Sequence, residues 1–140
     1  MREIGSCEVL AEMDDGTLEQ ILSGLPEDLE ILGVPREGLV LMTLREGLGS
    51  RFHPGEVQAC TCRVALGGME GWSAVLGGDS RRALVGAAFD AMGRCEPPPR
   101  ELPRMLELLE SARKAIEARR AEEASLSAST KVEFDLLAEA

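Results

Sequence analysis

The stretch from Glu56 to Leu66 constrains the fold more than any other part of the chain. Its even positions form a largely apolar set that begins at Gln58 and continues through Cys60 and Cys62, whereas Arg63 stands at an odd position. Side chains alternate between the two faces of a β-strand. The pattern therefore predicts a long strand with one face turned toward a core and Arg63 on the other face.

Three further strand-like runs surround this one, at residues 29–34, 39–45 and 71–76. The connections at 46–50 and 67–68 are short and contain glycine, which is typical of β-hairpins. We therefore predict an antiparallel four-stranded meander sheet packed by helices, in the α+β class.

Helical patterns occupy both ends of the chain. Residues 6–24 predict two short helices, with Thr17 capping the second. Asp79 and Ser80 can cap a helix that runs to about residue 94, and its small residues, Gly86 among them, would allow a close approach to the sheet. A long helix is predicted over about 101–125, with an apolar stripe of Leu102, Met105, Leu106, Leu109, Ala112 and Ile116.

The length of 140 residues favours one domain over two. We expect a single domain, 1–140, with a sheet core at about 27–95 and a C-terminal helical arm and extended tail at about 100–140. The tail alternates as a strand would and needs a surface to cover, on this domain or on a partner. Its predicted partner-binding residues are Val132, Phe134, Leu136 and Leu137.

The charge balance narrows the possible partners. Asp and Glu number 25 against 15 Lys and Arg, a formal charge of −10, which argues against nucleic-acid and anionic-membrane surfaces. No run approaches the ~20 apolar residues of a membrane helix, and the N-terminus has no apolar stretch of signal-peptide length. We expect a cytoplasmic protein whose four cysteines are reduced.

Few residues in the sequence are candidates for catalysis or metal binding. Cys60 and Cys62 could ligate a soft metal, but they share an apolar face and no second Cys/His pair completes four ligands, so packing in the core is favoured. His53, the single histidine, is placed in a loop between Phe52 and Pro54, where a surface or interface role is favoured over that of a general base.

Two loops resemble anion sites. Gly77-Gly78-Asp79-Ser80 precedes a helix N-terminus, but Asp79 already supplies negative charge there, which favours a turn and cap. Arg45 and Arg51 flank the glycine-rich connection at 46–50 and could hold a phosphate group bidentately, although solvated or partner-paired arginines are more common. No catalytic residue can be assigned, and no metal is expected.

An ordered combination of segments resembles one family. These are Gly38–Met42, the run from Arg45 to Val57, Cys62-Arg63-Val64, Gly77-Gly78-Asp79 leading into Ala87–Ala91, and Val132-Glu133-Phe134. Together they are similar to the G subunit of the bacterial carbon–phosphorus lyase system, the PhnG family of phosphonate metabolism. The loop at His53-Pro54 and the Gly77-Gly78-Asp79 turn depart from that family's pattern.

The resemblance implies a subunit of a core complex with the H, I and J proteins. With the L protein, the G, H and I proteins convert a phosphonate and MgATP into α-D-ribose 1-methylphosphonate 5-triphosphate and release adenine. The nucleosidase-like chemistry is usually assigned to the I subunit, so no cofactor is expected on this chain, and MgATP is a substrate of the complex.

The acidic charge fits this expectation, because a lone active site here would repel anionic ATP and phosphonate. Three hypotheses stay open. The chain is a non-catalytic or accessory subunit, at the extreme a purely structural one; or a catalytic or substrate-gating contributor whose Arg45 and Arg51 hold phosphates at a shared site; or a metal or redox module built on Cys60 and Cys62. Because a partner-binding arm exposes apolar surface, the isolated chain is also expected to self-associate, most simply as a dimer.

Overall fold

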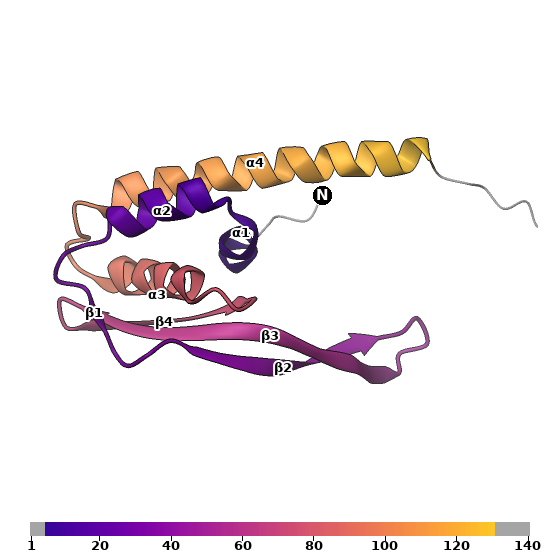
Figure 1. Cartoon of the computed structure of the whole chain (residues 1–140), viewed down its shortest axis with the longest axis horizontal. Coiled ribbons are helices and arrows are strands. Elements are labelled where there is room, and N and C mark those ends of the chain that lie inside the picture. Colours follow the sequence, from indigo (N-terminus) through magenta and orange to yellow (C-terminus); the bar gives the residue numbers. More distant parts are fainter. Residues whose placement is uncertain (1–4, 131–140) are drawn as a thin grey trace, which may run out of the picture.

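The computed structural model describes residues 5–130. Within that range lie the helices α1 (Ser6–Glu12), α2 (Asp15–Ser23), α3 (Ser80–Arg94) and α4 (Leu102–Ser129), and the strands β1 (Glu30–Ile31), β2 (Arg36–Arg45), β3 (Arg51–Leu66) and β4 (Met69–Leu76). All strand pairs are antiparallel. The predicted α+β class is confirmed, with its N-terminal helices and long C-terminal helix (Figure 1).

The sheet is organised around β3. Thr61 pairs with Arg36 of β2 on one side and with Ala74 of β4 on the other, so β2, β3 and β4 form a meander. The two-residue β1 pairs with β3 through Ile31 and Val64. It therefore lies in line with β2 along one edge of β3, and does not pair with β2 as a four-strand meander would require.

The alternation in β3 is confirmed where helices cover the sheet. Cys60, Cys62, Val64 and Leu66 are all at most 4% exposed, while Arg63 faces solvent and pairs with Glu70 at 2.9 Å.

The prediction of a loop around His53 is wrong, because β3 already begins at Arg51. The pairing register shifts between Met42, which pairs with Gly55, and Leu44, which pairs with Phe52. Over this interval β3 contains one residue more than β2, so β3 forms a bulge. Such a bulge accommodates Pro54, whose missing N–H would weaken a regular ladder.

Helices cover one face of the sheet in two layers. The α3 helix packs directly on β3 and β4, α1 contacts both β4 and α3, and α2 and α4 pack on the side of α3 away from the sheet (Figure 1). The small residues of α3 let this helix approach the sheet closely. At Gly86 there is no room for a side chain, because an added Cβ would lie 2.8 Å from Ser73 Oγ of β4. The predicted close approach is confirmed. The largest fully buried side chains join the layers: Met13, Leu18, Ile21, Met92 and Met105.

The α4 helix is only partly covered. Met105, Leu109, Ala112 and Ile116 are buried as the predicted stripe requires, whereas Leu106 is 48% exposed. The helix continues to Ser129, beyond the predicted end near residue 125, and residues 121–129 are exposed.

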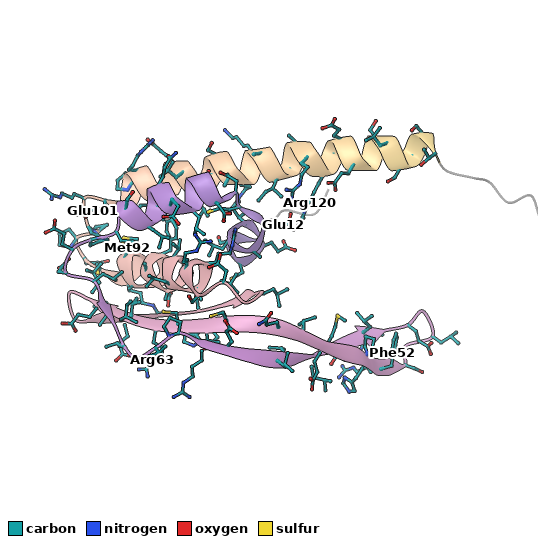
Figure 2. The ribbon with its side chains drawn as sticks, viewed as in Figure 1. Glu12, Phe52, Arg63, Met92, Glu101 and Arg120 are labelled. Atoms are coloured by element: carbon teal, nitrogen blue, oxygen red, sulfur yellow. The ribbon has the colours of Figure 1, made fainter. Side chains whose placement is uncertain are left out.

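Two arginines fasten α4 to α1. Arg119 donates to Glu12 at 2.6 Å, and Arg120 donates to the other oxygen of that carboxylate (Figure 2). This contact lies near the last buried turn of α4.

Gly71 provides a test of the contact between α3 and the sheet. An added Cβ would overlap the carbonyl oxygen of Ala87 and lie 2.5 Å from the backbone nitrogen of Ala91. We predict that Gly71→Ala lowers the free energy of unfolding by about 3 kcal/mol, because two backbones must separate. The measurement is urea-induced unfolding followed by circular dichroism.

Gly93→Ala is the matched control. Nothing lies within 4 Å of its added Cβ, and the residue is helical. We expect it to be neutral or to stabilise by up to about 1 kcal/mol. Equal stabilities of the two variants would contradict this account of the contact.

Candidate functional site

The longest exposed stretch of the described chain lies in the ribbon, defined here as residues 36–58 of β2, β3 and their connection. It extends beyond the end of α3, with Phe52 near its far end (Figure 2). Every residue of β2 is exposed, including Leu39 at 67% and Leu41 at 54%, and Phe52 is 46% exposed. Exposed apolar side chains in such density are typical of interaction surfaces.

Arg45 and Arg51 meet at the far end of this ribbon. The register places them directly opposite each other, on the same face, and both are exposed. Neither forms a hydrogen bond or ion pair with another described residue. Like charges at directly opposite positions destabilise a ribbon, so the pair is suited to an anionic group, such as a phosphate or a carboxylate.

His53 lies close to these arginines and is held by its own ribbon. Its Nδ1 lies 3.1 Å from Thr43 Oγ1 and 3.4 Å from the Met42 carbonyl oxygen. Among the described residues, no carboxylate or thiol bonds to it, and its side-chain neighbour is the Thr43 hydroxyl. The histidine is exposed, which fits the surface or interface role favoured from the sequence.

A second candidate is an apolar groove of about 500 Å³ beside the free edge of β4. Its walls come from α1, β4, α3 and α4, with Leu10, Phe89, Leu102, Leu106 and Leu109 among the lining residues. The carboxylate of Asp90 accepts a hydrogen bond from the Trp72 backbone N–H at 2.9 Å, and this bond lowers the pKa of Asp90. The groove is thus an apolar concavity, and the one acidic residue that lines it in the described chain, Asp90, already binds the strand edge.

The two cysteines of the Cys-x-Cys pair are 0% and 3% exposed. Burial raises the pKa of the Cys60 thiol, and the carboxylates of Glu37 and Asp79 act in the same direction. Burial also raises the pKa of Cys62. Both effects favour the neutral thiol, which is a poor metal ligand and nucleophile. Within residues 5–130, no group of three or more His, Cys, Asp or Glu side chains could hold a metal ion.

The Gly77-Gly78-Asp79-Ser80 turn is confirmed as a helix cap. Asp79 Oδ1 accepts from the Arg81 backbone N–H at 3.1 Å, and the Arg81 side chain lowers the pKa of this carboxyl group. The Asp79 carboxylate therefore already supplies a negative charge at the N-terminus of α3, which disfavours binding of another anion there.

Arg81 and Arg82 form a clasp that the sequence did not reveal. Arg82 is 14% exposed and donates to the carbonyl oxygens of Leu10 and Met13, at 2.8 and 2.7 Å. Arg81 donates to Glu19 at 2.6 Å. The paired arginines directly after the cap were the available signal, but their partners lie some sixty or seventy residues away and were not predictable.

The tail residues Val132, Phe134, Leu136 and Leu137 lie outside the described residues. Among residues 5–130 no helix is both long and apolar enough to cross a membrane. In the same range, the groups with shifted pKa values are helix caps, the carboxylate that caps the β4 edge, a clasp residue, the Arg120 guanidinium bound to Glu12, and the two buried thiols.

These features describe an α+β protein with two apolar surfaces, the exposed ribbon that ends in two arginines and the groove. The sequence profile of the family described as "Phosphonate metabolism protein PhnG" matches residues 5–139, and the chain belongs to that family. The family places it in phosphonate metabolism, as the resemblance implied, within a phosphonate-metabolism complex. A search among curated proteins gives no match.

Three of the four cysteines give a prediction that needs no substitution. Cys7 is exposed, whereas Cys60 and Cys62 are buried. We expect Cys7 to react with a thiol reagent within the mixing time, while Cys60 and Cys62 react only as fast as the protein unfolds, because the thiolate must first reach water. Peptide mass spectrometry after timed labelling measures each site, with Cys7 as the internal control. Rapid labelling of Cys60 or Cys62 would reopen the redox hypothesis.

Proposed function

We propose that this chain is a supporting subunit of the α-D-ribose 1-methylphosphonate 5-triphosphate synthase, within the carbon–phosphorus lyase core complex. Its partners there are the H, I and J subunits. In the reaction, a phosphonate oxygen forms a bond to C1′ of the ATP ribose while the bond to adenine breaks. The family match over residues 5–139 carries the proposal.

The distribution of charged and apolar groups supports a role that depends on partners. The chain carries a net charge of −10, which opposes independent binding of MgATP and a phosphonate. No catalytic set is assembled among the described residues, whereas apolar side chains are exposed along the ribbon. A subunit buries such a surface on assembly, and its partners then supply the reacting groups.

The arginine pair provides the chain's route to the substrate. Arg45 and Arg51 lie opposite each other without an acidic partner among the described residues. Guanidinium groups bind phosphate oxygens in a bidentate geometry. In this proposal the ribbon carries both arginines toward the triphosphate at a site shared with another subunit.

The test is adenine release by a complex reconstituted from co-expressed G, H and I subunits with the L protein. We expect Arg45→Ala/Arg51→Ala to lower the rate at least about tenfold, since each charged hydrogen bond contributes about 1.5–3 kcal/mol. Arg100→Ala/Arg104→Ala, which removes two exposed arginines elsewhere, is the control. An unchanged rate with intact assembly would remove the substrate contact and favour the purely structural role.

The partner-binding role of the tail has its own test. We predict that replacing Val132, Phe134, Leu136 and Leu137 by Ser abolishes co-purification with the I subunit, because the apolar side chains of the segment are lost. Replacing Lys131, Glu133 and Asp135 by Ser changes the alternate positions and should preserve assembly. Equal recovery of the two variants would overturn the assignment of these four residues to partner binding.

A further inference from the structure

The free edge of β2 has hydrogen-bonding groups without partners in the described chain. The Leu32 N–H donates to the Arg63 carbonyl at 2.8 Å, so the odd residues of β3 direct their backbone groups toward the β1/β2 side. Their partners in β2 are Arg36, Gly38 and Val40. By the alternation of an antiparallel ladder, the N–H and C=O groups of Glu37, Leu39, Leu41, Thr43 and Arg45 point outward.

This edge lacks the usual protection against pairing. Native edge strands are commonly interrupted by proline, charge or a bulge. Between Gly38 and Leu44 the sequence Gly-Leu-Val-Leu-Met-Thr-Leu contains neither a charge nor a proline, and the extra residue of the bulge belongs to β3. All ten residues of β2 are exposed. A regular, apolar, open strand edge of this length is a template for another strand.

The charged residues at the two ends of β2 indicate which strand would pair with this edge. An Arg-Glu dipeptide occurs at each end, Arg36-Glu37 and Arg45-Glu46. We propose that two copies of this chain form a symmetric dimer by antiparallel pairing of their β2 strands, centred on Leu41. In this register Arg36 faces Glu46 of the other copy, and Glu37 faces Arg45. Two-fold symmetry repeats both pairs, so every charge at the edge meets its opposite.

The register is specific. Opposed residues must both direct their backbone groups toward the shared edge, which restricts the alternatives to shifts that keep odd residues opposite odd residues. The neighbouring registers, centred on Val40 or Met42, separate Arg36 from Glu46 and Glu37 from Arg45. Only the Leu41-centred register combines the charge pairs with the contact of Val40 with Met42 across the interface.

The pairing would also reduce the electrostatic repulsion between Arg45 and Arg51 at the end of the ribbon. Within one chain Arg45 lies opposite Arg51. In the dimer, Glu37 of the second copy adjoins Arg45 on the same face and offsets this repulsion, and an anion bound by Arg45 and Arg51 would compete with that carboxylate. The two sheets become one continuous sheet across the two-fold axis, with the helices of both copies on the same side. The ribbon extends past α3, which leaves its edge accessible (Figure 1).

Charge reversal in the isolated full-length chain tests the proposal, which does not depend on the proposed function. Glu37→Arg places two arginines opposite each other, and Arg45→Glu places two glutamates opposite each other. Each should weaken dimerisation about tenfold, measured by sedimentation equilibrium, because attraction becomes repulsion at two symmetric positions. The double variant Glu37→Arg/Arg45→Glu restores opposite charges and should restore dimerisation to within about threefold. The control is Arg104→Glu on α4, which changes the net charge by as much as Arg45→Glu does but lies outside β2, and it should leave dimerisation unchanged.

A proline variant tests the backbone pairing separately. The N–H of Leu41 points to the free edge, so Leu41→Pro removes no hydrogen bond of the single chain but eliminates the central pair of the dimer. We expect a monomer with an unchanged circular dichroism spectrum. The proposal is overturned if the wild-type chain stays monomeric at 1 mM or if single charge reversals leave the dimer unchanged. Failure of the double reversal to recover dimerisation would overturn it equally.

Discussion

The structure depends on the contact of α3 with β4, where backbone meets backbone. Gly71 has no side chain at the point where Ala87 and Ala91 pass, and Gly86 leaves room for Ser73. The hydroxyl of Ser73 then donates to the Ala83 carbonyl at 2.5 Å, inside the core. Because small residues set this distance, α3 lies flat on β3 and β4, and α2 and α4 pack on its far side (Figure 1).

The same contact leaves the other half of the sheet uncovered. A helix of 15 residues spans about 22 Å at 1.5 Å per residue, whereas the 16 residues of β3 span about 54 Å at 3.4 Å per residue. The ribbon therefore extends beyond its helical cover and exposes Leu39, Leu41 and Phe52. It also carries equal numbers of arginines and glutamates within a chain of net charge −10. Like-charge repulsion is consequently weaker at the ribbon than over the rest of the protein, which suits it for assembly.

Period-two alternation predicted the buried face of β3 because strand geometry and burial coincide at Cys60, Cys62 and Val64. It failed at His53 and Pro54, where a bulge carries the strand through residues that usually interrupt one. The position of Arg45 and Arg51 around a hairpin connection was visible in the sequence. The sequence did not show that Arg45 and Arg51 lack an acidic partner among the described residues. Such partners come from distant segments, as those of Arg81 and Arg82 do.

By itself, the sequence determined the local elements and their buried faces, because alternation, caps and apolar stripes are encoded over a few neighbouring residues. It also determined the family, through an ordered set of segments spread over most of the chain. Only the tertiary structure decided which half of the sheet is covered and which edge of β2 stays open. Those outcomes depend on where α3 ends relative to β3, a relation between segments that no short stretch of sequence contains.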